Sequence, residues 1–311
     1  MCCLFGIYNY GNTPIKNLNV LTNALARQAT ARGKDATGIA YCNNGKLVIH
    51  KEAKSAFDIN FKHPDSVVAV MGHTRHTTQG KECFNFNNHP FPGSCKNIKF
   101  ALAHNGILSN EAQLRQKFNL PQTKIQTDSY IAVQLLNYKK ELNTDNLKFM
   151  AEQVKGSFAF TVLDEKNTLN LIRGDNPLSL LHFPDKKLYV YASTDSILLK
   201  GLIDANFFDD IKTGRFEEIN IKSGDILSIS PDGTIKHNTF EYTDTSYLSY
   251  FNWWNYGAYS RYGYGKTYSD TYVEDLKSIA KGLGYEPDSI DELLSEGFTP
   301  EEVEEYIYCM E

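Results

Sequence analysis

The chain has 311 residues, enough for one large domain or for one domain with an appendage. Its 32 Lys and Arg against 37 Asp and Glu give a formal net charge of −5, which argues against a strongly basic nucleic-acid-binding protein. No apolar run reaches the ~18 residues of a membrane-spanning helix, and the first residues lack the pattern of a secretory signal. Six cysteines in a chain of this length do not indicate a disulfide framework. We therefore expect a cytoplasmic globular protein.

Short apolar runs, many with a period of two, predict strands through most of residues 1–240. In chain order they are 4–8, 38–41, 46–50, 67–72, 99–103, 157–163, 169–172, 188–191 and 225–229. Helical spacing of apolar residues predicts helices over 18–28, 128–138 and 146–154. Strands outnumber helices and several are joined by short turns. This pattern predicts an α+β fold in which mostly antiparallel sheets are covered by helices.

Two shifts in composition mark the end of the chain. Segment 241–268 contains eight Tyr, one Phe and both Trp, and we interpret it as an aromatic-rich linker. Residues 269–311 are predicted to be an acidic helical tail, because 271–311 hold 12 acidic residues against two lysines. Three capping-box patterns, beginning at Thr271, Ser289 and Thr299, predict three short helices there. Both segments could dock a partner protein or fold back on residues 2–240.

A thiol stands at the second position of the chain. Removal of the initiator methionine would leave Cys2 at the N-terminus, beside its own α-amine. That amine has a reference pKa of ~7.7–8.0, close to what a general base needs at neutral pH. One residue would then supply both nucleophile and base. The alternative is that Cys2 is an ordinary buried thiol at the start of a strand.

Six short motifs resemble, in the same order, those of the class II glutamine amidotransferases. Residues 1–6, Met-Cys-Cys-Leu-Phe-Gly, resemble the M-C-G-I-F-G opening; 32–39 resemble R-G-P-D-S-x-G-I; 72–80 resemble G-H-T-R-W-A-T-H-G; 88–91 resemble the N-A-H-P turn; 103–107 resemble the H-N-G-I segment; and 127–129 resemble S-D-T. The resemblance covers residues 2–240 and is closest to the glutaminase domain of glucosamine-6-phosphate synthase. It implies the αββα sandwich of the N-terminal-nucleophile hydrolases. It also implies hydrolysis of L-glutamine to glutamate and ammonia through a Cys2 thioester, without metal or organic cofactor.

The resemblance also assigns roles to residues. Asn105 and Gly106 would stabilise the oxyanion, one through its side-chain amide and the other through a backbone N–H that no Cβ shields. Arg75 would bind the α-carboxylate of glutamine with its planar guanidinium, Asp128 would bind the α-ammonium, and Thr78 would add a further contact. By residue type alone, Asn-Gly is a tight turn, Arg75 a surface ion pair and Asp128 an acid at a helix start. The supporting residues are Arg32, His76 and Gln79. We expect Arg32 to hold the loop near the N-terminus or to form a plain salt bridge.

Three positions depart from the family pattern. Cys3 replaces Gly, where its side chain could crowd the nucleophile or be oxidised with a nearby thiol. His76 replaces Trp and Gln79 replaces His, and both changes could alter substrate fit. The positions with assigned roles in catalysis and binding are retained, which favours an active site. A zinc site built from His73, His76, Cys83 and His89 is a weaker interpretation, since two of these residues belong to the family motifs.

About 70 residues follow residue 240, too few for the synthase domain to which family members are fused. We therefore expect a separate ammonia-acceptor protein, docked on the linker or tail, or a free-standing amidohydrolase. A homo-oligomer is compatible with the sequence, whereas nucleic acid and membrane are not expected partners. Two other functions stay open. One is hydrolysis of another γ-glutamyl or amide substrate, and the other is a non-catalytic binding module on the same scaffold.

Overall fold

A computed structural model describes residues 2–11, 18–96, 98–242 and 286–295, together with Val273, Lys277 and Val303. The chain divides into two compact units, Met1–Trp254 and Asn255–Glu311. Residues 243–268 of the predicted linker, including Trp253 and Trp254, lie outside the described part, as does most of the predicted tail. In the described part, no helix is both long and apolar enough to cross a bilayer.

The first unit contains a seven-stranded sheet whose strands pair antiparallel throughout. Its order is β11-β9-β10-β1-β4-β2-β3, and the paired registers are all antiparallel. The strands are β1 (Cys3–Asn9), β2 (Ala36–Asn43), β3 (Lys46–Glu52), β4 (Ala69–Arg75), β9 (Ser179–Phe183), β10 (Leu188–Ala192) and β11 (Glu217–Ile219). The strand that begins next to Cys2 is therefore in the centre of this sheet, where every residue of β1 is buried.

A second antiparallel sheet has six strands in the order β13-β12-β8-β7-β6-β5. They are β5 (Phe91–Cys95), β6 (Ile98–Leu108), β7 (Gly156–Asp164), β8 (Leu169–Arg173), β12 (Asp225–Ile229) and β13 (Ile235–Thr239). The longest strand pair of this sheet, β6 with β7, runs from Phe100 opposite Asp164 to Leu108 opposite Gly156. This pair carries the segment that contains Asn105 and Gly106.

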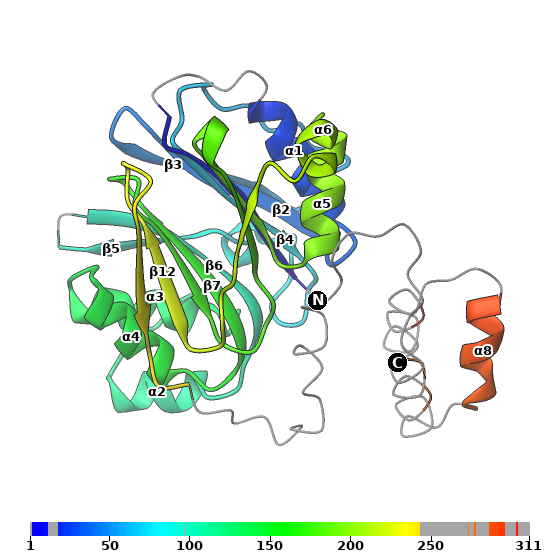
Figure 1. Ribbon diagram of the computed structural model, residues 1–311. Helices are drawn as coiled ribbons and strands as arrows, with labels where there is room; N and C mark the ends of the chain where they lie inside the picture. The colour runs from blue at the N-terminus through cyan, green and yellow to red at the C-terminus, as the bar shows by residue number, and fades with distance from the viewer. Residues whose placement is uncertain are drawn as a thin grey trace. The chain divides into compact units, whose positions relative to one another are not determined.

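The two sheets and two groups of helices form four layers (Figure 1). Helices α1 (Leu18–Ala29) and α5 (Asp195–Asp204) share one apolar cluster with Cys3, Phe5 and Ile7 of β1, and α6 (Phe208–Lys212) adds Ile211 to it. Helices α2 (Glu111–Lys117), α3 (Tyr130–Lys139) and α4 (Thr144–Gln153) share a second cluster with β6 and β7. A third cluster, with Leu4 and Tyr8 of β1, packs against residues of the other sheet. Two short 3₁₀ helices, Asn85–Asn87 and Pro184–Lys186, lie in loops.

The predicted fold class is confirmed, because the structure has two antiparallel sheets covered by helices, in the order αββα. Every strand predicted from residues 1–240 is present, and most are one to six residues longer than predicted. The helix predicted over 128–138 begins at Tyr130, since Asp128 and Ser129 use their polar groups outside the helix. In the second unit, α8 (Asp288–Ser295) corresponds to the middle tail helix, with Ser289 in its first turn.

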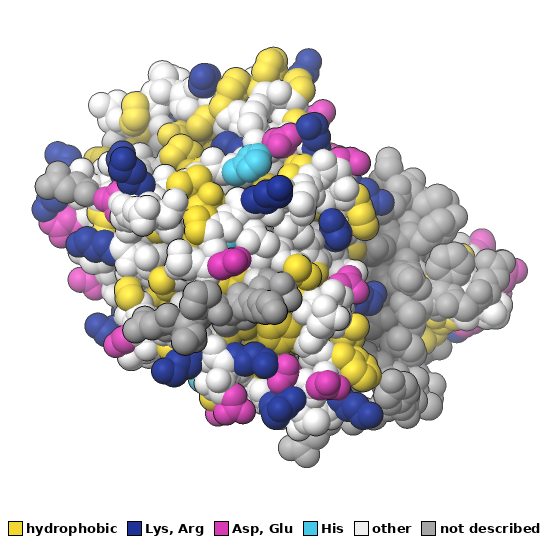
Figure 2. All heavy atoms as spheres, turned by 90° about the horizontal axis from the view of Figure 1, so that it is seen from above, with side chains coloured by type: hydrophobic (Ala, Val, Ile, Leu, Met, Phe, Trp, Pro, Cys, Tyr) yellow, Lys and Arg dark blue, Asp and Glu magenta, His cyan; other side chains and the backbone are white. Residues whose placement is uncertain are grey.

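The surface of the molecule mixes charges of both signs. Figure 2 shows Lys and Arg side chains interspersed with Asp and Glu over one face, with apolar side chains between them.

Candidate active site

Cys2 immediately precedes the central strand β1, next to the end of β4 and to the turn that carries Arg32. The register places Cys3 opposite Thr74 of β4, so Cys2 adjoins Arg75 and His76. The Cys2 thiol donates to the carbonyl of His76 at 3.6 Å, and the Cys2 carbonyl accepts from Arg32 Nε at 3.0 Å. Burial raises the pKa of this thiol, against the lowering effects of the His76 contact, the terminal amine and the nearby Arg75 and Arg32. A raised pKa keeps the sulfur protonated at neutral pH, so nucleophilic attack from here requires a base.

Cys3 belongs to the opposite face of the strand. Its side chain is fully buried in the cluster shared with α1 and α5, and its thiol donates to the Leu4 carbonyl at 3.3 Å. Successive residues of a strand point to opposite faces. The Cys3 side chain therefore does not point towards that of Cys2, which argues against both the predicted crowding of Cys2 and a Cys2–Cys3 disulfide. The five described cysteines, Cys2 among them, are free thiols.

Arg75 is buried rather than part of a surface ion pair. Its guanidinium donates to Asn88 Oδ1 at 2.7 Å, to the Gly80 carbonyl at 2.9 Å and to the Gln79 carbonyl. Burial lowers the pKa of Arg75. One cation thus contacts both ends of loop 76–88 and stands next to Cys2, and its hydrogen-bond acceptors are uncharged.

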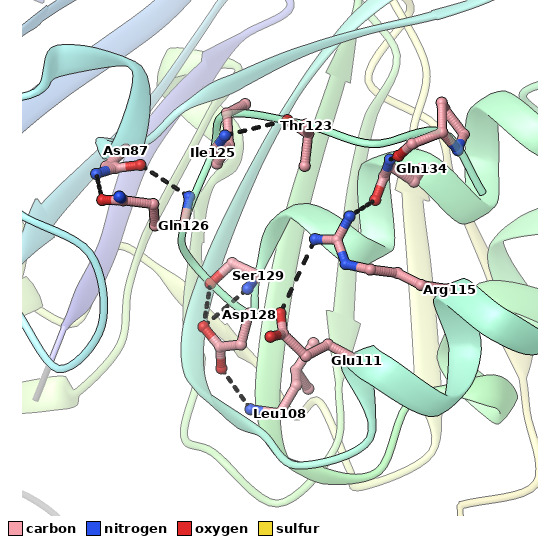
Figure 3. Close-up of polar contacts among 11 residues, drawn as sticks. Asn87, Leu108, Glu111, Arg115, Thr123, Ile125, Gln126, Asp128, Ser129 and Gln134 are labelled. Carbon is pink, nitrogen blue, oxygen red and sulfur yellow. Dashed lines mark hydrogen bonds and ion pairs between the residues drawn. The ribbon is translucent and has the colours of Figure 1, made fainter.

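Loop 76–88 is tied to a second loop by an amide pair. Asn87, itself fully buried, accepts from the Gln126 N–H and donates to Gln126 Oε1, both at 2.9 Å (Figure 3). Gly80 sits against this pair, because a Cβ there would be 2.9 Å from Gln126 Cβ. Thr78, the predicted substrate contact, and the predicted supporting residues His76 and Gln79 are exposed. Their side chains are therefore accessible to a ligand.

Asn105 and Gly106 lie within strand β6, so the interpretation of this pair as a tight turn is wrong. The Asn105 side chain is buried and donates to Ser193 Oγ at 3.4 Å. Ser193 Oγ also accepts from the Leu4 N–H at 2.8 Å, and the Ser193 N–H donates to the Leu4 carbonyl at 2.8 Å. Ser193 thereby joins the Asn105 amide to the beginning of β1, two residues from Cys2.

The Gly106 N–H points away from its paired strand. Gly106 is opposite Phe158, whose N–H donates to Asp175 Oδ1 at 2.9 Å on the far side of β7. Opposite residues of an antiparallel pair exchange both hydrogen bonds or neither. The Gly106 N–H is therefore directed to the other side of β6, where β5 stops at Leu102. On that same side the His104 carbonyl lies 3.0 Å from Nε2 of His73, the residue opposite Leu4.

Asp128 lies just before α3 and binds the end of the same strand. Its Oδ2 accepts from the Leu108 N–H at 2.6 Å, and its Oδ1 accepts from the Ser129 N–H at 2.8 Å (Figure 3). The side chain is buried. The predicted role at a helix start is thus replaced by a contact with β6, two residues beyond Gly106.

Three buried histidines lie close to these residues: His73 in β4, His89 just before β5 and His104 in β6. The rings of His73 and His89 have centroids 4.1 Å apart, and His104 Nδ1 is 2.8 Å from Ser129 Oγ. Burial lowers the pKa of all three, that of His73 to about 3. His76 and Cys83, the other members of the weighed zinc set, are exposed. Within the described ranges, no group of His, Cys, Asp or Glu is arranged to hold a metal ion.

Two residues that hold this site were not predicted from the sequence. Ser193 follows β10, and Asn176 lies in the turn after β8, from which Nδ2 donates to the Asn105 carbonyl at 2.7 Å. The sequence around Ser193 carries one usable signal, a Ser-Thr-Asp run that predicts the start of a helix. Its contact with β1 depends on strand pairing over 189 positions of separation, which local patterns do not reveal.

The sequence and the fold were compared with known proteins. Residues 85–200 match a family described as glutamine amidotransferase domain. The glutamine–fructose-6-phosphate aminotransferase (isomerizing) of Listeria monocytogenes is 29% identical over 207 residues, 65% of this chain and 32% of the relative. The 7-cyano-7-deazaguanine synthase of Saccharolobus solfataricus is 24% identical over 71% of this chain and 48% of the relative. The chain thus spans about a third to a half of the length of these relatives.

One solved structure shares the fold over most of the chain. The glutamine phosphoribosylpyrophosphate amidotransferase of B. subtilis superposes with a TM-score of 0.61, at 23% identity, over 78% of this chain and 50% of that one. This likeness concerns the arrangement of the sheets and helices.

Proposed function

Because the chain contains a class II glutamine amidotransferase domain, we propose that it hydrolyses the side-chain amide of L-glutamine at Cys2. The observation that carries the proposal is the link between the beginning of β1 and strand β6. The Cys2 thiol precedes β1, the buried Asn105 amide is joined to Leu4 of β1 through Ser193, and the Gly106 N–H beside Asn105 faces away from β7. An acyl transfer to sulfur needs this combination of one nucleophile and two oxyanion donors.

In the proposed mechanism, Met1 is removed and the α-amine of Cys2 becomes free. The amine takes the thiol proton, directly or through a water, while the sulfur forms a bond to the amide carbon of glutamine. Asn105 and Gly106 stabilise the tetrahedral oxyanion. The C–N bond then breaks, ammonia leaves with the transferred proton, and water hydrolyses the thioester to release glutamate. The raised pKa of the Cys2 thiol supports the need for a base in this mechanism.

The same proposal assigns the substrate contacts. Arg75 would meet the α-carboxylate, since it is a buried cation whose hydrogen bonds go to uncharged acceptors. Asp128 would meet the α-ammonium, Thr78 would contact the glutamate portion, and Arg32 would keep the Cys2 backbone in place. The exposed His76 and Gln79 favour one alternative substrate class, other γ-glutamyl amides, because they leave the loop's outer side open.

The partners and boundaries follow as proposals of the same kind. We assign residues 2–240 to the amidotransferase domain, 241–268 to a linker and 269–311 to an acidic tail. Ammonia would pass to a separate acceptor protein that docks on the linker or tail. The proposed setting is cytoplasmic.

The test of the proposed activity uses the two neighbouring thiols as a matched pair. Cys2→Ala is expected to abolish glutamate release from glutamine. Cys3→Ala removes a thiol that faces the helix layer and should retain glutamate release, with some loss of stability from the cavity. Glutamate is measured enzymatically in both variants and in the wild-type protein. Substantial activity in Cys2→Ala would contradict the proposal.

A further inference from the structure

We propose that Asn176 is a positioning residue that orients and polarises the Gly106 N–H for oxyanion binding. This inference rests on the proposed hydrolysis at Cys2. It concerns a residue in the turn between β8 and β9, remote in sequence from the six motifs.

The contact is a hydrogen bond to one particular peptide group. Asn176 Nδ2 donates to the carbonyl oxygen of Asn105 at 2.7 Å. That carbonyl belongs to the same peptide unit as the Gly106 N–H. In a trans peptide the C=O and N–H point in opposite directions. Asn176 therefore binds this peptide unit from the β7 side. The Gly106 N–H of the same unit faces the side of β6 that meets His73 and β1.

The turn that carries Asn176 is itself fixed to β7. Asp175 Oδ1 accepts from the Phe158 N–H at 2.9 Å, and the Gly174 N–H donates to the Phe158 carbonyl at 3.0 Å. Phe158 is the residue opposite Gly106. Two consecutive residues of the turn thus hold the strand partner of Gly106, and the third holds the carbonyl that precedes Gly106.

Gly106 leaves room for this arrangement. Its φ of +140° lies in a region that side chains disfavour, and a Cβ there would be 2.6 Å from Asn176 Nδ2 and 2.0 Å from the Ser157 carbonyl oxygen. The absence of a side chain thus lets Asn176 approach the peptide.

A hydrogen bond accepted at an amide oxygen strengthens the donor at the other end of the same amide. Developing negative charge on the substrate oxygen would therefore be stabilised better with Asn176 present than without it. Because the Gly106 N–H itself remains, the loss should be smaller than the 10²–10³-fold reported for deleting a donor. We expect a decrease of about tenfold in kcat.

The experiment compares Asn176→Ala with Asn170→Ala. Asn170 likewise donates from Nδ2 to a strand carbonyl, that of Val162 in β7 at 3.4 Å, but lies well along the sheet from Gly106. Asn176→Ala should lower kcat for glutamine about tenfold, with KM within about twofold. The rate of Cys2 alkylation by iodoacetamide should stay within about twofold, because that substitution needs no oxyanion. Asn170→Ala should change stability but none of these rates.

Asn176→Asp provides a second variant of nearly the same shape. Its carboxylate cannot donate and adds negative charge near the developing oxyanion, so kcat should fall further than in Asn176→Ala. Unchanged kcat in both variants would overturn the inference while leaving the proposed function intact. A lower kcat accompanied by a raised KM and a slower alkylation of Cys2 would also overturn it, because these changes together would indicate a general structural role. A wild-type protein that does not hydrolyse glutamine would overturn the proposed function, and this inference with it.

Discussion

Ser193 shows how one side chain can serve both the fold and the site. Its hydroxyl accepts from the Leu4 N–H at 2.8 Å and from the Asn105 amide at 3.4 Å. The first hydrogen bond satisfies a buried backbone donor of the central strand. The second orients the side chain that we assign to the oxyanion. We therefore expect both stability and the proposed catalysis to depend on the same oxygen atom.

Ser193→Ala should lower the free energy of unfolding by ~1–3 kcal/mol, because the Leu4 N–H loses its acceptor. The same variant should lower kcat, since the Asn105 amide loses its anchor. Ser228→Ala serves as the control, because Ser228 Oγ donates to Asn170 Oδ1 at 2.7 Å, within the sheet and away from β1. Urea unfolding and glutamate release give the two readouts. A Ser193→Ala protein with wild-type kcat would show that Asn105 does not need this contact.

At the same scale, residue types and spacing predicted part of the site. The motifs name Cys2, Asn105, Gly106, Arg75 and Asp128, which the structure places directly before β1, within β6, at the end of β4 and just before α3. Their partners Ser193 and Asn176 were not named. Their contacts arise from the pairing of strands distant in sequence, so that a local pattern carries no trace of them.

Among the elements, the turn after α1 contacts both the Cys2 backbone and loop 76–88. Arg32 binds the Cys2 carbonyl at 3.0 Å, and Asp35 Oδ2 accepts from the Thr77 N–H at 2.6 Å. Gly33, between them, packs on the end of β4, where a Cβ would be 2.5 Å from the carbonyl carbon of Arg75. The backbone of the turn must therefore approach β4 closely.

Gly33→Ala should push the turn away from Arg75 and lower glutaminase activity at least about tenfold, since Arg32 and Asp35 move with it. Gly45→Ala is the matched control. Gly45 has φ +71° and open space around its Cα, so alanine there costs only backbone strain, about 1–2 kcal/mol. Steady-state kinetics and thermal unfolding separate the two effects. Equal activity in the two variants would contradict a role for this turn in the site.

The elements that the sequence predicted are those with a clear apolar period. Strands β1, β4 and β7 carry continuous buried runs and were predicted, whereas β11 and β13 are short, largely exposed strands at the sheet edges and were not. Strand β5 was missed because Pro92 and Gly93 interrupt its pattern. Helices α2, α5 and α6 also escaped prediction, although Thr194 caps α5 by accepting from the Ile197 N–H.

Across the whole molecule, three neutral histidines are enclosed between the layers near the proposed site. His73, His89 and His104 are buried, and burial lowers the pKa of each below the ordinary value of 6.5. In the unfolded chain these groups bind protons below about pH 6.5, while in the folded protein they remain neutral to lower pH. The unfolded state therefore binds more protons in that range, and acid favours unfolding.

The free energy of unfolding should be at its full value above about pH 6.5 and should fall as the pH drops towards 5. Each histidine contributes a slope of ~1.4 kcal/mol per pH unit once its unfolded form is protonated. His73→Gln should reduce the slope by about one such contribution. Leu163→Ala, a buried residue of the cluster between the sheets, should lower stability equally at both pH values. Urea unfolding at pH 7 and 5 measures both, and an unchanged slope in His73→Gln would contradict this account.

The claim that Cys2 is a free N-terminal nucleophile in a glutamine-binding site is tested most directly by intact mass. The protein is weighed before and after incubation with the glutamine analogue 6-diazo-5-oxo-norleucine, in the wild type, Cys2→Ala and Cys3→Ala. The account predicts loss of Met1 and one covalent adduct in the wild type and in Cys3→Ala, and no adduct in Cys2→Ala. Retained Met1 with no adduct, or an adduct that persists in Cys2→Ala, would contradict it.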